Sequence, residues 1–176
     1  DGDMDLEGGT FPTGYAYVFK NTGRTLENSY CWRNAFPATR SIALTWGDAN
    51  GDGEIDLVKG SNGSTPPHNF EIFFSKDGVL PTSPSWKSGF PSYTYYSYLA
   101  DCDGDDDLDL VYSSGDGLAC YFHRASGLEK TPSWVYHCGP PYGIFDLRVG
   151  DVNGDGFLDV AAGCTSSSGY PTGGPN

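Results

Sequence analysis

The stretch DCDGDDDLDL at residues 101–110 places six aspartates within ten positions. Two further stretches repeat its spacing, DANGDGEIDL at residues 48–57 and DVNGDGFLDV at residues 151–160, and DGDMDL at residues 1–6 matches its second half. The last aspartates of the four copies, at positions 5, 56, 109 and 159, are separated by 51, 53 and 50 residues. A period of about fifty residues predicts a repeat architecture in which every repeat carries the same acidic loop.

The acidic loops have the residue types and the spacing that calcium requires. Ca²⁺ takes about six to eight oxygen ligands, and side chains at positions 1, 3 and 5 of a tight loop point towards one centre. We expect position 7 to offer its backbone carbonyl and the aspartate at position 9 to close the site. The sequence thus predicts about three Ca²⁺ ions, held in the first loop by Asp48, Asn50, Asp52, Glu54 and Asp56, in the second by Asp101, Asp103, Asp105, Asp107 and Asp109, and in the third by Asp151, Asn153, Asp155, Phe157 and Asp159.

Position 6 of each loop must allow a sharp turn. Gly53 and Gly156 hold this position in two loops, and Asp106 holds it in the second, where we expect a left-handed backbone. The second loop has aspartate at every ligand position, so we expect it to depend most on metal. An EF-hand is excluded because no glutamate stands at position 12 and the flanks are not helical. Mg²⁺ fits less well than Ca²⁺, since it rarely accepts an all-protein cage.

The segments between the loops have the alternation of β-strands. GYAYVFKNTGR at residues 14–24 and NFEIFFSKDGV at residues 69–79 alternate around a polar turn. A short apolar run after each loop, a tryptophan segment and a strand leading into the next loop bring the total to about four strands per repeat. No helical period of useful length is present. The predicted fold class is all-β, with four-stranded blades of the β-propeller type.

The blade repeats are predicted approximately at residues 1–47, 48–100, 101–150 and, in part, 151–176, within a single repeat domain 1–176. Propellers typically close with about four to eight blades, so about three blades predict an open arc or part of a larger propeller. We therefore expect self-association, for example into a filament, or completion by missing segments of a longer parent chain. The tryptophans that recur once per repeat, and that we expect to pack between blades, are Trp32, Trp86 and Trp134.

These features together resemble the FG-GAP/VCBS repeat family. The resemblance rests on the repeated D-x-[DN]-x-D-[GD]-x-x-D-[LV] loop, on the hairpin YVFKNTG at residues 17–23, and on SPSW at 83–86 and TPSW at 131–134. It implies calcium-loop β-propeller blades of the kind found in integrin α-subunit heads and some fungal lectins. The Phe-Gly and Gly-Ala-Pro signatures of the integrin version are absent, so the VCBS form is the more similar.

Charge and composition exclude two classes of partner. The net charge is −13 with only 10 Lys and Arg residues, whereas nucleic-acid binding requires a basic face. No apolar run approaches the roughly 18 residues of a membrane span, so we expect no membrane insertion. The four loop segments hold 16 of the 23 acidic residues, a concentration of charge that divalent cations would offset.

Cysteines and a sequon favour an extracellular chain, either secreted or at the cell surface. The five cysteines include no C-x-x-C pair, so disulfides are favoured over a zinc site. Cys120 and Cys138 flank one predicted turn region and are the candidate disulfide, with buried free thiols as the alternative. Asn62-Gly63-Ser64 is an N-glycosylation sequon, which makes Asn62 the candidate glycosylation site.

The expected function is that of a calcium-stabilised, non-enzymatic extracellular structural or adhesion module. The alternative is a lectin-like propeller that binds glycans, in which aromatic residues of FPSYTYYSY at residues 90–98 stack on sugar rings. A polysaccharide-active enzyme is less favoured, because His68, His123 and His137 lie on different segments and G-x-S-x-G, H-E-x-x-H and P-loop motifs are absent. No catalytic residue is therefore assigned.

Overall fold

The computed structural model describes residues 4–10, 13–37, 40–62, 70–89, 93–138 and 142–166. The regular elements within these ranges are β1 (Leu6–Gly9), β2 (Ala16–Phe19), β3 (Trp32–Arg33), β4 (Ser41–Gly47), β5 (Asp56–Ser61), β6 (Phe70–Phe73), β7 (Trp86–Lys87), β8 (Thr94–Ala100), β9 (Asp109–Ser114), β10 (Gly117–Tyr121), β11 (Trp134–His137), β12 (Tyr142–Gly150) and β13 (Asp159–Ser166). These ranges contain no helix, and hence none of the length and apolarity that a membrane crossing requires.

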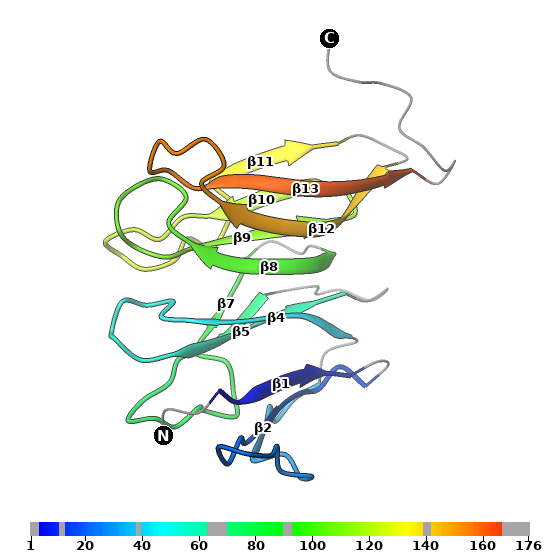
Figure 1. Ribbon diagram of the computed structural model, residues 1–176, viewed down its shortest axis with the longest axis vertical. Helices are drawn as coiled ribbons and strands as arrows, with labels where there is room; N and C mark the ends of the chain where they lie inside the picture. The colour runs from blue at the N-terminus through cyan, green and yellow to red at the C-terminus, as the bar shows by residue number, and fades with distance from the viewer. Residues whose placement is uncertain are drawn as a thin grey trace.

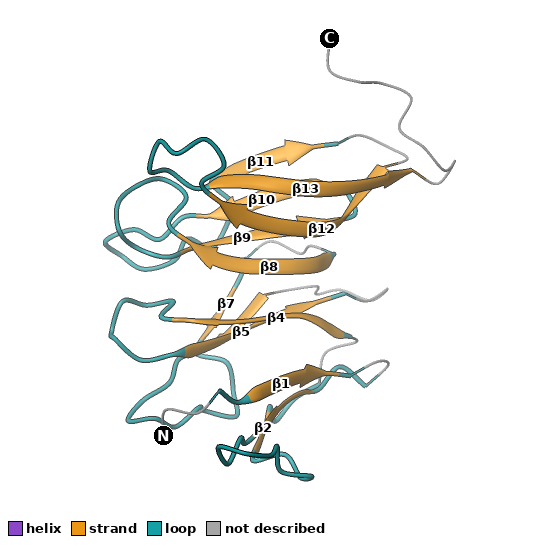
Figure 2. Ribbon diagram, in the orientation of Figure 1, coloured by secondary structure: helices purple, strands orange, loops and turns teal. Residues whose placement is uncertain are grey.

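The strands form four antiparallel sheets in chain order, and none of the sheets closes into a barrel. The first sheet contains β1 to β3, the second β4 to β7, the third β8 to β11 and the fourth β12 and β13. Figure 1 shows the sheets stacked along the long axis of the molecule, and Figure 2 shows the described segments between their strands as loops. The leading strands β4, β8 and β12 pack side by side. The prediction of an all-β fold made of propeller-like blades is confirmed.

The strand before each acidic loop pairs with the strand after it. Gly47 of β4 lies opposite Asp56 of β5, and Ala100 of β8 lies opposite Asp109 of β9. The same pairing joins β12 to β13. Each loop therefore connects the first two strands of one sheet, and the three loops lie on the same side of the stack (Figure 1). The sequence repeats and the sheets share one period, but each sheet begins one strand before its loop.

Central strands bury side chains on both faces in alternation. Leu57 of β5 packs with Phe73 against the first sheet, whereas its neighbour Val58 belongs to the core between the second and third sheets. In β9, Leu110 faces that same core, and Val111 faces the core shared with β12. Burial on both faces explains why these strands read as continuous apolar runs in the sequence.

Two of the three recurring tryptophans join neighbouring sheets. The Trp32 ring meets Phe73 of the next sheet edge-on, with the ring centroids 5.1 Å apart, and Trp86 meets Tyr121 in the same manner at 6.0 Å. Each indole N–H donates to a backbone carbonyl of the next repeat, at 3.2 Å and 3.1 Å respectively. Trp134 is 44% exposed. Packing between sheets is therefore confirmed for the first two tryptophans, whereas Trp134 lies on an exposed sheet face.

Candidate metal centre

The aspartate at position 1 organises each loop by accepting hydrogen bonds from backbone N–H groups. In the first loop, Asp48 Oδ1 accepts from Asp52 at 3.0 Å and Oδ2 accepts from Gly53 at 2.7 Å. Asp101 and Asp151 accept the equivalent bonds in the second and third loops. The aspartate at position 1 thus holds all three loops along the same backbone path.

Positions 3 and 5 repeat a second pattern. The amide oxygens of Asn50 and Asn153 each accept a hydrogen bond, at 2.9 Å, from the backbone N–H at position 5. Asp52, Asp105 and Asp155 in turn accept from the backbone N–H at position 7, at 2.9, 3.1 and 2.9 Å. These bonds hold the side-chain oxygens of the predicted ligands inside the loop.

Two backbone positions in each loop are left-handed. Position 4 is glycine throughout, with φ values of 74°, 80° and 77° at Gly51, Gly104 and Gly154. At position 6, Asp106 has a φ of 70°, so the prediction of a left-handed aspartate is confirmed. Sequence reasoning singled out position 6 alone, although the glycine shared by position 4 of all three loops signals the same requirement.

The aspartate at position 9 joins its loop to the end of the third strand of the sheet. Asp109 is fully buried, and its two oxygens accept from the backbone N–H of Cys102 at 2.9 Å and of His123 at 2.7 Å. Asp56 has the same arrangement, with bonds of 3.0 Å and 2.8 Å. Burial raises the pKa of both carboxyl groups in spite of these bonds. A neighbouring cation would favour their charged form.

The N-terminal segment at residues 1–6, which matches the second half of an acidic loop in sequence, also has part of this hydrogen-bond arrangement. Asp5 Oδ1 accepts a hydrogen bond of 2.7 Å from the backbone N–H of Asn21, which corresponds to the bond that Asp109 receives from His123. Asp5 is exposed, and the first three residues of the segment lie outside the described residues. The similarity of this segment to the loops therefore extends to its hydrogen bonding.

The second loop gathers carboxylates around one point. One oxygen from each of Asp101, Asp103 and Asp109 lies within 4.8 Å of the other two. Burial acts to raise the pKa of Asp101, but four backbone N–H donors together lower it below its usual value. Charged carboxylates this close repel one another, and their oxygens are the ligands that Ca²⁺ prefers.

Side chains at position 7 are used outside the loop centre. The Glu54 carboxylate accepts two backbone N–H bonds, at 2.7 Å and 3.0 Å, from the turn that follows β6. Asp107 Oδ2 lies 3.2 Å from His123 Nδ1, and the third loop has Phe157 at this position. The backbone carbonyl is therefore the group that position 7 has left to offer a metal.

A cation that sequence reasoning did not assign contacts the second loop. Arg124, which follows β10, forms an ion pair with Asp103, and its Nη1 lies 3.8 Å from Asp105 Oδ2. The guanidinium offsets part of the negative charge of the loop. A signal was present in the sequence, because Lys76 holds the equivalent position beside the first loop.

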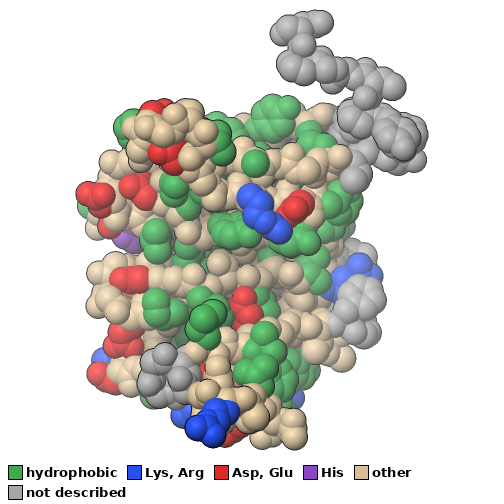
Figure 3. All heavy atoms as spheres, viewed as in Figure 1, with side chains coloured by type: hydrophobic (Ala, Val, Ile, Leu, Met, Phe, Trp, Pro, Cys, Tyr) green, Lys and Arg blue, Asp and Glu red, His purple; other side chains and the backbone are tan. Residues whose placement is uncertain are grey.

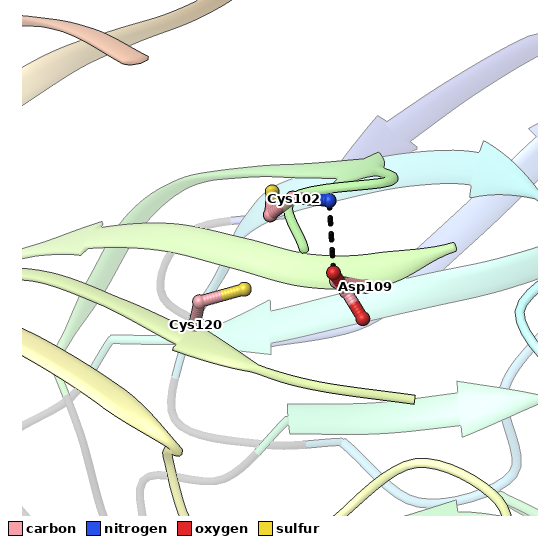
Figure 4. Close-up of side chains that lie close together, drawn as sticks. All are labelled: Cys102, Asp109 and Cys120. Atoms are coloured by element: carbon pink, nitrogen blue, oxygen red, sulfur yellow. Dashed lines mark hydrogen bonds between the residues drawn. The ribbon is translucent and has the colours of Figure 1, made fainter. Parts of the chain in front are cut away.

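The predicted disulfide is incompatible with the register of the third sheet. Cys120 lies opposite Trp134, whereas the backbone N–H of Cys138 donates to the Asp116 carbonyl at 3.1 Å. Positions 116 and 120 are four residues apart along one strand, roughly 13 Å, and a disulfide joins Cα atoms less than about 7 Å apart. Cys120 instead lies close to Cys102 (Figure 4).

The predicted glycosylation site lies in a restricted environment. Asn62 follows β5 and is 7% exposed, and its backbone N–H donates to the Arg40 carbonyl at 3.1 Å. The other two sequon residues and His68 lie outside the described residues. Because a glycan requires an accessible side chain, this burial weighs against glycosylation at Asn62.

Comparison with known proteins supports the interpretation of the loops. No curated protein matches the chain at a significant level. Residues 101–162 match the model of the FG-GAP-like repeat family. The match begins at the first aspartate of the second loop and ends within β13, so it includes the second and third loops and the strands between them. Residues 101–162 therefore form an FG-GAP-like repeat, which confirms the resemblance for this part of the chain.

Proposed function

We propose that this chain is a calcium-stabilised, non-enzymatic structural or adhesion module that works outside the cell. The observation that carries the proposal is the convergence of Asp101, Asp103 and Asp109 in a loop whose hydrogen-bond pattern recurs twice. Each loop would hold one Ca²⁺ through side chains at positions 1, 3, 5 and 9 and the carbonyl at position 7. The match to the FG-GAP-like repeat family supports this reading.

Calcium would relieve the charge that the loops concentrate on one side of the molecule. Figure 3 shows acidic side chains along the side of the stack on which the loops lie. Three Ca²⁺ ions would change the formal charge from −13 to −7, since −13 + 6 = −7. A ligand that binds only the folded chain stabilises it by mass action. Calcium would thus link the first two strands of the second, third and fourth sheets and, through Asp56 and Asp109 at position 9, the third strand of the second and third sheets.

An extracellular location fits the low charge of two of the sites. Asn50 and Asn153 replace a carboxylate at position 3 of the first and third loops. Sites in extracellular modules bind calcium with dissociation constants of about 10⁻⁴ to 10⁻³ M, which suits the calcium concentration outside cells. The second loop, with aspartate at position 3, would bind most tightly.

We further propose that the module packs against sheets of the same kind, in a second copy or in further segments of a longer chain. Trp134 and Tyr136 on β11 are 44% and 52% exposed, although the equivalent Trp86 is buried against the next sheet. Aromatic side chains on an open sheet face are typical of a surface that another sheet covers. Packing of this kind would serve a structural role.

A lectin-like function is the second candidate, and one groove favours it. A cavity of about 560 Å³ is lined by residues that include Trp46, Tyr96 and Tyr98. Aromatic rings of this kind stack on sugar faces. Residues 90–92 of the aromatic segment lie outside the described residues. A glycan array of the wild type and Y96A tests this candidate: saturable binding that Y96A abolishes would support it.

Calorimetric titration of the EDTA-treated chain with Ca²⁺, together with thermal denaturation, tests the main proposal. We expect about three bound ions and a Tm that rises with calcium, because each ion binds the folded loops. The matched control is D101N/D103N/D105N, which should bind one ion fewer and keep the other two. A wild-type Tm that EDTA leaves unchanged, or the absence of binding, would contradict structural calcium.

A further inference from the structure

Two cysteines meet at the junction between the second loop and the third sheet. Cys102 holds position 2 of the loop, and Cys120 is a buried residue of β10. Their sulfur atoms and one carboxylate oxygen of Asp109 all lie within 4.8 Å of one another. Both cysteines also pack in the apolar cluster beneath β12. Figure 4 shows the three residues on neighbouring segments, with the bond from Cys102 N–H to Asp109 drawn between them.

The first repeat shows that this junction is a regular packing position of the fold. Ala49 corresponds to Cys102, because each donates its backbone N–H to the aspartate at position 9, at 3.0 Å and 2.9 Å. Ile72 corresponds to Cys120 by strand register, since it pairs with the second residue after that aspartate. Ala49 and Ile72 are buried in one core cluster. The second repeat therefore has cysteine at both members of a site where the first repeat has two apolar side chains.

A zinc site is the rival interpretation of two thiols beside a carboxylate. Structural zinc is bound by four ligands, almost always in tetrahedral geometry. Among the described residues, the group that contains the two thiols has one further metal-ligating side chain, Asp109, so it is one ligand short of four. A direct bond between the two sulfur atoms therefore fits the junction better.

We propose that Cys102 and Cys120 form a disulfide that fastens the second calcium loop to β10. The bond forms by thiol–disulfide exchange with a low-molecular-weight disulfide such as oxidised glutathione. One cysteine thiolate attacks the glutathione disulfide and releases one glutathione thiol. The second cysteine then attacks the mixed disulfide and releases the other, so the two cysteines are oxidised while one disulfide is reduced to two thiols. The bond requires no calcium and stands independently of the proposed function.

The cross-link would enclose most of the second metal loop. The cysteines are 18 residues apart, since 120 − 102 = 18, and Asp103, Asp105, Asp107 and Asp109 lie between them. A disulfide that closes a loop of this length restricts the unfolded chain, which raises the folded-to-unfolded ratio roughly 100-fold. The second loop would then keep its shape when calcium is scarce.

Peptide mapping of the oxidised wild-type chain tests the linkage directly. The chain is equilibrated with excess oxidised glutathione in calcium buffer, digested without reduction and analysed by mass spectrometry. Chymotrypsin is required, because trypsin leaves both cysteines in one peptide between Lys87 and Arg124. We expect a peptide that joins Cys102 to Cys120, present in C31S and absent in C102S. A link from Cys120 to Cys138, or free thiols at positions 102 and 120, would overturn the proposal.

A stability measurement distinguishes a structural cross-link from an incidental one. The double variant C102A/C120I restores the residues of the first repeat and should fold whether or not the disulfide exists. We expect oxidation to raise the folded-to-unfolded ratio of the wild type roughly 100-fold over the dithiothreitol-treated chain, and to leave the variant unchanged. Equal redox sensitivity of both proteins would overturn the proposal, as would thiols that resist oxidation and retain one equivalent of zinc.

Discussion

The backbone N–H of His123 donates a hydrogen bond of 2.7 Å to the carboxylate of Asp109. The bond ties the end of an acidic loop to the segment that follows the third strand of the sheet. Equivalent bonds join Ser75 to Asp56 at 2.8 Å and Asn21 to Asp5 at 2.7 Å. The aspartate at position 9 thus has a structural role in the repeat in addition to the role of ligand that we propose for it.

Replacing Asp109 with alanine should destabilise the chain more than replacing Asp107. D109A leaves the buried N–H groups of Cys102 and His123 without acceptors, and each loss costs about 1–3 kcal/mol. D107A removes a side chain that is 48% exposed and should cost less than about 1 kcal/mol. We expect urea denaturation to give a loss of about 2–4 kcal/mol for D109A. Equal losses for the two variants would show that the loop register is wrong.

Removing Arg124 should increase the calcium affinity of the second loop. The Arg124 guanidinium and Ca²⁺ would compete for the carboxylates of Asp103 and Asp105. An exposed ion pair of this kind is weak, so R124Q should bind calcium only slightly more tightly at this site, by up to about fivefold. Without calcium the variant should be less stable than the wild type, because the carboxylates lose their cation.

Calorimetry measures the affinity, and K76Q is the matched control. Lys76 holds the position beside the first loop that Arg124 holds beside the second. K76Q should therefore leave the second site unchanged. Weaker calcium binding by R124Q would instead mean that the arginine holds the loop in its binding conformation.

Glu7 should make stability depend on pH near neutrality. Its Oε2 is buried and has no hydrogen-bond partner in the described part of the chain, and burial raises its pKa from 4.5 to about 7. The folded state therefore holds the proton more tightly than the unfolded state. The resulting stability is complete below about pH 4.5 and is lost as the pH rises towards 7. The loss is on the order of 2–3 kcal/mol.

The variant E7Q isolates this effect. A glutamine does not titrate, so E7Q should have the stability of the wild type or slightly less at pH 5, and should be more stable than the wild type at pH 8. Urea denaturation at both pH values and at constant calcium measures the difference in unfolding free energy between E7Q and the wild type. The other acidic groups are the same in both proteins, so their contributions to this difference cancel. Wild-type and E7Q curves that run parallel between pH 5 and pH 8 would contradict the assignment.

The backbone of the loops could be predicted from sequence because its requirements act residue by residue. Position 6 requires a residue that tolerates a left-handed backbone, which Asp106 has. Strand pairing is different. The alternation in residues 41–47 suits a pairing with either neighbouring strand, and packing against the adjacent sheets selects the one after the loop.

Strand register, which local sequence does not determine, also explains why the disulfide between Cys120 and Cys138 was predicted wrongly. Cys120 and Cys138 flank a turn region in the sequence, but the register of β10 and β11 places Trp134 opposite Cys120. Cys102 lies within an acidic loop, and nothing in its local pattern indicates contact with β10. Comparison of repeats contained the signal, since Ala49 and Ile72 hold the corresponding positions.

Trp86 and Trp134 occupy the same place in successive sheets, yet they are 8% and 44% exposed. W86A removes an indole that meets the Tyr121 ring and donates to the Leu128 carbonyl, so it should lose about 3–5 kcal/mol of unfolding free energy. W134A should lose less than about 1.5 kcal/mol, because much of its surface is already in water. Urea denaturation of dilute protein measures both values.

Replacing Trp134 should reduce self-association more than replacing Trp86, which is the opposite of their order for stability. Sedimentation velocity over a range of concentrations should show that the wild type gains mass and that W134A remains monomeric, because the exposed face of β11 loses its aromatic anchor. The control is Y93A, an aromatic residue that is 45% exposed elsewhere, which should associate like the wild type. Association of W134A equal to that of the wild type would place the interface on another surface. A wild type that stays monomeric at all concentrations would rule out the second copy as the partner and leave further segments of a longer chain.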